Sequence, residues 1–356
     1  MKKQISIASA FVAASGLSLG EIKVNEYLSF EGFVDVSYAE VNSNLGTQDE
    51  SDNFLGVQEV EIDWLFNFDR VGARVDLQHE DNIDRNFVEQ AYITYELCTG
   101  SNITAGRYAT MLGYDSLERT GLHQWSNAYS IHNAFIASPL TDYFLDNLAI
   151  TPAYNQGLKY TYESNGNFFG ISIQDGAISD KLGSYDPDRF GGDNQSSYGL
   201  EIAGALQLAP GLRWFIGGAY EDTDINHADS NYVLNSHLSY ETGSWNFGVE
   251  LNYGESESGL FAFQYVDEKV FQAMVSANYA YSDAASITGR ISTFNHEEDI
   301  ANGRESDGLK FTLAHKYAYT DNLALVNEVS YVDGQVDDND NDYDSLLFGT
   351  SLLFSF

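Results

Sequence analysis

The feature that most constrains this chain is an alternation of apolar and polar residues with a period of two, which recurs from residue 28 to the carboxyl end. In one early segment Val60, Ile62 and Trp64 alternate with Glu61 and Asp63. A period of two is typical of β-strands, whose successive side chains point to opposite faces. The pattern predicts an all-β fold of about sixteen strands, with fourteen or eighteen left open by one uncertain hairpin around residues 255–270.

The connections between these strands alternate between short and long. The short ones are hairpin-turn sequences at Asp69, 99–101, 165–166, 210–211, 242–243, 282–284 and 321–322. The long ones are expected at 42–53, 79–87, 109–155, 175–196, 222–230, 255–269, 295–306 and 333–344. This order predicts an up-and-down meander with all long loops at one end and both termini at the other. It is typical of a transmembrane antiparallel β-barrel, whereas a soluble β-sandwich has no reason to segregate its loops by length.

Aromatic residues gather at the strand ends on the apolar face, as expected of a barrel in a bilayer. Examples are Trp214 and Trp245 beside short turns, and Tyr220 and Tyr253 towards long loops. Amphipathic rings favour the two membrane interfaces. A closed barrel also pairs every backbone polar group between strands, as crossing hydrocarbon requires.

The amino-terminal twenty residues have the order of a secretory signal peptide. Two lysines follow Met1, an apolar stretch runs from Ile5 to Leu19, and small residues stand at Ser18 and Gly20. We therefore expect residues 1–20 to be cleaved and residues 21–356 to form a single barrel domain.

The charge and residue inventory excludes several function classes. The net charge of −36 opposes nucleic-acid binding, and the single cysteine permits no internal disulfide. The strand pair His237 and Ser239 has no third orienting group, so no enzyme activity is expected. No cofactor is expected either.

The chain resembles the Gram-negative outer-membrane porins, both the general-diffusion type and a related β-barrel porin family. Three features carry the resemblance: the terminal strand 348–356 ending in Phe356, the long third loop 109–155, and a short block from 106 to 130. That block contains Gly106, Arg107, Tyr108, Thr110, Gly113, Tyr114, Asp115, Asn127, Tyr129 and Ser130. The resemblance implies an outer-membrane location, periplasmic termini, a homotrimer and a third loop folded into the pore. The Pro-Glu-Phe-Gly-Gly sequence common in that loop of general porins is absent.

A barrel of this size leaves a water-filled lumen lined by the polar strand faces. The inward set is rich in carboxylates, led by Glu31, Asp35, Glu59, Glu61, Asp63 and Asp76, and poorer in bases. Carboxylates attract cations, so the sequence predicts a cation-preferring channel for small hydrophilic solutes and ions. The alternative that these residues form a solvated wall, with selectivity set by a few constriction residues, stays open.

General porins place basic wall residues opposite acidic residues of the third loop. By this resemblance the expected constriction combines Arg70, Arg74 and Arg107 of the wall with loop acids. The loop candidates are Asp115, Glu118, Asp142 and Asp146.

Other interpretations remain open at this point. Loop aspartates Asp338, Asp340, Asp342 and Asp344 could bind Ca²⁺ through oxygen ligands, and the surface is expected to meet lipid and lipopolysaccharide. Third-loop aromatics such as Tyr114, Trp125 and Tyr129 could instead guide sugars. A non-conducting barrel could act as a surface adhesin.

Overall fold

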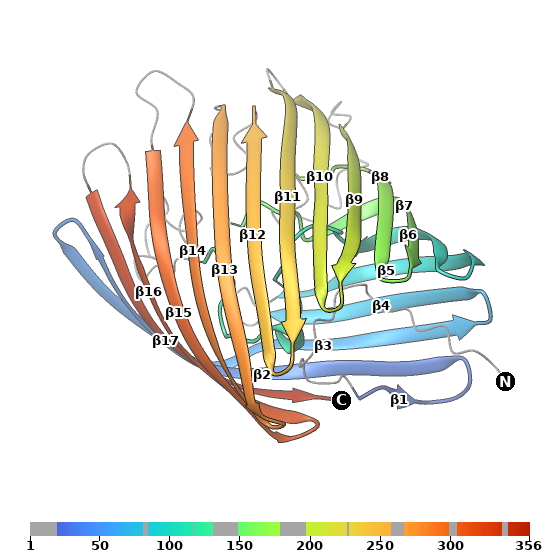
Figure 1. Ribbon diagram of the computed structural model, residues 1–356, viewed down its shortest axis with the longest axis horizontal. Helices are drawn as coiled ribbons and strands as arrows, with labels where there is room; N and C mark the ends of the chain where they lie inside the picture. The colour runs from blue at the N-terminus through green and yellow to red at the C-terminus, as the bar shows by residue number, and fades with distance from the viewer. Residues whose placement is uncertain are drawn as a thin grey trace.

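The computed structural model is a closed antiparallel β-barrel (Figure 1). It describes residues 20–80, 85–115, 117–130, 149–178, 197–225, 228–257, 267–298, 305–336 and 341–356. Within these ranges sixteen strands, β2 to β17, each pair with the next along the chain, and β17 pairs with β2 to close the barrel. A two-residue strand, β1 (Ile22–Lys23), adds to the start of β2. The predicted all-β barrel of sixteen strands is confirmed.

The barrel strands run as follows: β2 Leu28–Leu45, β3 Gln48–Phe68, β4 Val71–Glu80, β5 Arg85–Cys98, β6 Ser101–Ala109, β7 Tyr154–Ser164, β8 Asn167–Gln174, β9 Ser197–Ala209, β10 Leu212–Ile225, β11 Ala228–Thr242, β12 Trp245–Ser256, β13 Glu268–Ser282, β14 Ala285–Glu298, β15 Glu305–Thr320, β16 Leu323–Val336 and β17 Asn341–Ser355. The third loop, between β6 and β7, also contains a one-turn 3-10 helix at Arg119–Gly121. No helix among the described residues is long and apolar enough to cross a membrane.

The seven predicted short connections are two-residue turns. At Asn165 and Gly166 both φ angles are positive, 53° and 78°. Positive φ at both central residues matches the right-handed twist of the flanking strands, which is why Asn-Gly favours this hairpin. The carboxyl terminus lies at the same end of the barrel, because Phe356 exchanges backbone hydrogen bonds with Gly32 of β2 (Figure 1). Both ends of the described chain therefore lie beside the short turns, as predicted.

Several predicted long loops are in fact continuations of strands. The predicted loop 42–53 is wrong: β2 and β3 stay paired as far as Leu45 and Gln48, around a turn at Gly46. Strands β10, β12, β14 and β16 likewise extend into their predicted loops. These extensions are polar on both faces, so they lack the apolar alternation that marks a strand, while the backbone ladder continues to satisfy their polar groups. The third and fourth loops remain the long ones.

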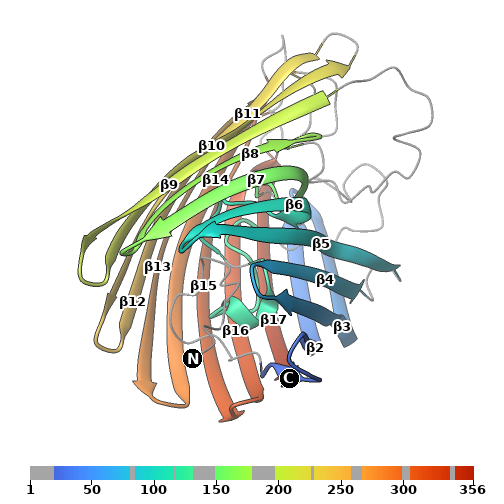
Figure 2. The same ribbon diagram turned by 90° about the vertical axis from the view of Figure 1, so that its right-hand side faces the viewer.

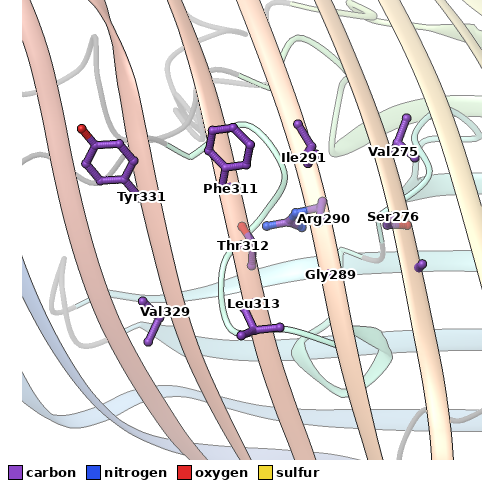
Figure 3. Close-up of a pocket in the computed structure, with 11 residues that line it drawn as sticks. Val275, Ser276, Gly289, Arg290, Ile291, Phe311, Thr312, Leu313, Val329 and Tyr331 are labelled. Carbon is purple, nitrogen blue, oxygen red and sulfur yellow. The ribbon is translucent and has the colours of Figure 1, made fainter.

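The barrel has an apolar outside and a polar inside. On β12 the side chain of Leu251 is 50% exposed, whereas its neighbour Glu250 is 2% exposed. Figure 3 shows the same outward face farther round, where Ile291 of β14, Phe311 and Leu313 of β15 and Val329 of β16 line one stretch of the surface. An exposed apolar belt on this scale would associate in water, so it indicates contact with lipid.

Aromatic side chains ring this belt at both ends. Beside the short turns Trp245 stacks on Tyr279 with ring centroids 4.5 Å apart, and at the other end Tyr232 and Tyr253 lie 6.2 Å apart. These pairs fall where the alternation placed the interfacial aromatics. The barrel therefore carries the two girdles expected of a membrane-spanning sheet.

Candidate pore constriction

The described residues of the third loop, 110–115, 117–130 and 149–153, lie in the lumen between β6 and β7 of the wall and the opposite strands (Figure 2). Among them, Met111, Leu112 and Tyr129 are buried against side chains of the barrel wall. These described residues do not pair as strands, so their backbone N–H and C=O groups need other partners, which the wall can supply. The expectation that the third loop enters the pore is confirmed.

Three buried glutamates of the wall accept hydrogen bonds from this loop. Glu201 on β9, Glu250 on β12 and Glu328 on β16 are each at most 2% exposed. Their carboxylates accept backbone N–H groups from Met111, from Tyr114 (2.8 Å), and from Trp125 (2.8 Å) and Ser126 (2.9 Å), respectively. Such charge-assisted bonds are stronger than bonds between neutral groups. These glutamates therefore fix the path of the loop.

Basic side chains of β14 and β15 hold the loop from its carbonyl side. Arg290 donates to Ser126 O at 2.8 Å and pairs with Asp115 at 3.0 Å. Lys310 donates to Ser130 O at 2.8 Å, and Lys316 donates to Leu122 O at 3.1 Å. All three bases are buried. Their positive charge is thus directed at the loop, and not at an open channel.

The opposite wall, formed by β2 to β5, carries the predicted acidic cluster. Arg74 on β4 contacts Asp76 (2.7 Å), Asp63 (2.9 Å) and Glu31 (3.4 Å). Glu59 of β3 contacts Arg119 of the loop at 3.3 Å. Asp35 and Glu61 are 1% exposed. All six predicted lumen residues therefore lie on the inward face, opposite exposed residues such as Val36 and Ile62.

Three residues of the third loop have shifted pKa values. Burial raises the pKa of Glu118, whose carboxylate accepts a hydrogen bond from Tyr154 Oη at 3.3 Å. Burial, together with the charge of Lys316, lowers the pKa of His123 to about 4. His123 is therefore neutral at pH 7. Burial also raises the pKa of Tyr114 to about 12.

The structure places the predicted constriction residues in different surroundings. Arg74, Asp115 and Glu118 lie within the lumen contacts described above. Arg70 does not share the inward face with Arg74, because it occupies the β3–β4 turn, donates to Glu96 O at 2.9 Å and lies over the Tyr95 ring. That expectation is corrected.

Arg107 and the remaining candidates have different outcomes. Arg107 donates to Glu89 O at 2.9 Å and lies 6.0 Å from the Tyr154 ring centre, so it braces β5 and β7 where the loop departs. Asp142 and Asp146 lie outside the described residues, as do Asp338 and Asp340 of the suggested calcium site. Asp342 and Asp344 lie on β17, where Asp344 accepts a hydrogen bond from Asn44 at 2.9 Å.

Sequence reasoning missed Arg119. Its guanidinium contacts Glu59, donates to Trp125 O at 2.6 Å and lies over the Trp125 ring at 5.7 Å. A signal was present, because Arg119 is the one arginine or lysine between residues 110 and 153. A single base in a loop that enters an acidic lumen is expected to meet the acidic wall.

Comparison with known proteins bears on the same architecture. The family model described as "Putative beta-barrel porin-2, OmpL-like" matches residues 143–356, more than half of the chain. The chain belongs to this family. It is accordingly an outer-membrane β-barrel porin, with a channel-forming fold. No curated protein matches at a significant level.

Solved porin structures share the fold of this OmpL-like porin at low sequence identity. An anion-selective porin from Comamonas acidovorans has 13% identity and a TM-score of 0.60, with 92% of this chain and 99% of that chain covered. OmpF of Salmonella typhi has 14% identity and a TM-score of 0.60, covering 94% and 100%. OmpT of Vibrio cholerae has 13% identity and a TM-score of 0.57, also covering 94% and 100%.

Proposed function

We propose that this porin is a cation-preferring diffusion channel for small hydrophilic solutes and ions. The observation that carries the proposal is the unequal use of charge in the lumen. On β2 to β4 the carboxylates of Glu31, Asp35, Glu59, Glu61, Asp63 and Asp76 line one wall, where Arg74 and Arg119 contact them. Farther round the lumen, Arg290, Lys310 and Lys316 donate to loop carbonyls. The excess negative charge attracts cations and opposes anions.

The reversal potential of the purified porin in a planar bilayer under a KCl gradient tests this proposal. We expect stepwise conductance and a reversal potential displaced towards the K⁺ equilibrium potential. Anion preference, as named for the Comamonas porin, would refute the charge argument. A folded barrel without conductance would favour the adhesin alternative.

A sugar-specific channel is less well supported, because the described loop aromatics are engaged with the wall. Tyr129 donates to Glu250 at 3.0 Å and packs on Met274, and Trp125 donates its indole N–H to Ser37 at 3.1 Å. A stacking path for sugars would need free ring faces along the channel. Liposome swelling with neutral sugars of equal size but different stereochemistry separates the two alternatives, since a simple diffusion channel passes them at equal rates.

We further propose that the short turns and both termini face the periplasm and that the porin assembles as a homotrimer in contact with lipopolysaccharide. One solved structure of Vibrio cholerae OmpT is named as a trimer form, which supports the assembly. The native Cys98 is exposed beside the β5–β6 turn and reports the orientation. A maleimide too large for the pore is expected to label Cys98 only after the outer membrane is permeabilised. The matched control is the double variant Thr47→Cys, Cys98→Ala, whose cysteine lies at the β2–β3 tip and is expected to be labelled on intact cells. Light scattering of the purified complex measures the trimer.

A further inference from the structure

The acidic wall contains a carboxylate that accepts no hydrogen bond from an N–H group or hydroxyl of the described residues. Glu61 on β3 is 1% exposed, and neither of its side-chain oxygens has a hydrogen-bond partner among the described residues. Nη2 of Arg74 lies 3.9 Å from Glu61 Oε1, beyond hydrogen-bond distance. Arg74 is instead bonded to Asp63 and Asp76. A buried and unsatisfied carboxylate is costly unless a proton or a cation joins it.

Two other carboxylates converge on Glu61. One oxygen each from Glu59, Glu61 and Glu118 lies within 4.8 Å of the others. Glu59 and Glu61 share the inward face of β3, while Glu118 comes from the third loop. Three oxygens with separations of at most 4.8 Å lie no more than about 2.8 Å from a common centre, close to the Ca²⁺–oxygen distance of about 2.3 to 2.6 Å. Mg²⁺ requires shorter bonds of about 2.0 to 2.1 Å and a near-ideal octahedron, which suits this spacing less well.

The local charge balance also favours a cation. Arg119 contacts Glu59 and Asp35, and Arg74 contacts the other acids of this wall. These two guanidinium groups contact six carboxylates, namely Glu31, Asp35, Glu59, Glu61, Asp63 and Asp76, and Glu118 lies beside them.

From the unsatisfied Glu61 and the three converging oxygens, we propose that Glu59, Glu61 and Glu118 form a Ca²⁺ site that joins the third loop to the barrel wall. Water and neighbouring oxygens would complete the coordination shell, since Ca²⁺ takes six to eight ligands. The site goes beyond the proposed channel function and does not depend on it, because binding can be measured without conductance.

Terbium luminescence of the folded full-length porin in detergent tests the site. Tb³⁺ replaces Ca²⁺ at oxygen sites, and Tyr154, whose hydroxyl lies 3.3 Å from Glu118, is positioned to sensitise it. Measurements in about 0.15 M KCl, where the Debye length is about 8 Å, screen the exposed acidic surface. We expect a saturable signal that CaCl₂ displaces at lower concentration than MgCl₂.

Two substitutions probe the site from its two sides, and a third controls for charge. We expect Glu61→Gln and Glu118→Gln to weaken Ca²⁺ binding by at least the roughly tenfold that loss of an outer-shell partner costs at metal sites. Glu241→Gln removes the same charge from an exposed position on β11 and is expected to leave binding unchanged. Glu118→Gln lies outside the strands, so it keeps the test valid if the wall variant fails to fold.

The outcomes separate this site from the channel proposal. Equal binding by wild type, Glu61→Gln and Glu118→Gln would overturn the site, as would an equal loss in Glu241→Gln. The absence of saturable, Ca²⁺-displaceable signal would mean that protons balance the cluster, which also overturns it. A barrel that binds Ca²⁺ at this site but prefers anions would refute the proposed function alone.

Discussion

The third loop is held in the lumen by a few charged contacts, and Glu328→Gln measures the strength of one of them. The Glu328 carboxylate accepts N–H groups from Trp125 and Ser126 and the hydroxyl of Ser126. A glutamine of the same shape offers one acceptor oxygen and turns an NH₂ group towards the remaining donors. One Glu328 oxygen accepts both N–H groups and the other accepts the hydroxyl. A glutamine with its oxygen at the first position therefore keeps the two N–H bonds as neutral bonds and loses the bond from the hydroxyl.

The size of the effect follows from the one bond that is lost and the two that become neutral. Hydrogen bonds to charged groups contribute about 1.5 to 3 kcal/mol each and bonds between neutral groups about 0.5 to 1.5 kcal/mol, so the total loss is about 3 to 6 kcal/mol. Since 1.4 kcal/mol corresponds to a factor of about ten, the docked state of residues 125–126 loses a factor of at least about one hundred relative to the undocked state. Glu201, Glu250 and Arg290 still hold the rest of the loop. Barrel unfolding is expected to change little, because no strand pairing is lost.

Liposome swelling with neutral sugars of increasing size is the appropriate assay, because it does not respond to the altered lumen charge. We expect Glu328→Gln to admit larger sugars than the wild type, and Glu241→Gln, which removes one exposed charge, to behave as the wild type. An unchanged size limit in Glu328→Gln would refute the view that this carboxylate fixes the width of the channel.

Three further perturbations test other contacts of the loop. A Cβ added at Gly248 would lie 2.2 Å from Tyr114 Cζ, so Gly248→Ala is expected to displace the loop at a cost of about 1 to 3 kcal/mol and to change the single-channel conductance. In the control Gly289→Ala the added Cβ meets nothing within 4 Å, so the conductance should not change. Burial holds His123 neutral with a pKa of about 4, so the unfolded or undocked state, with an ordinary pKa of 6.5, binds more protons between those values. Loop docking is thus fully stabilised above about pH 6.5 and weakens as pH falls towards 4. His123→Gln should remove the contribution of this histidine to the pH dependence of sugar permeation. An identical pH profile in the variant and the wild type would contradict the argument. Arg290→Met leaves Asp115 without its ion-pair partner and should destabilise loop docking by about 3 to 5 kcal/mol. The measurement is the rate of proteolysis at the third loop, which is expected to rise. An unchanged rate would show that Arg290 is dispensable.

Much of the fold could be predicted from the sequence because a membrane barrel imposes the same rule on every strand. Each strand must alternate apolar and polar side chains where it crosses lipid, and Asn165-Gly166 and its counterparts mark the turns. The rule lapses beyond the membrane. Residues 42–53 are polar on both faces, so the alternation could not reveal that β2 and β3 remain paired there.

The candidate site was only partly predictable, since inward carboxylates look alike along the sequence. Nothing local distinguishes Glu328, which caps loop N–H groups, from Glu61, whose oxygens have no hydrogen-bond partner among the described residues. Arg70 and Arg74 have the same spacing parity, yet one ends in a turn over Tyr95 and the other in the acidic cluster.

The sequence by itself indicated about sixteen strands and determined the inward and outward faces, the turn ends and the acidic character of the lumen, because these depend on residue period and on lipid contact. The tertiary structure decided which wall charges meet the third loop. Those contacts join residues such as Trp125 and Glu328, more than two hundred positions apart, and arise only when barrel closure brings β16 and the loop to the same point in the lumen.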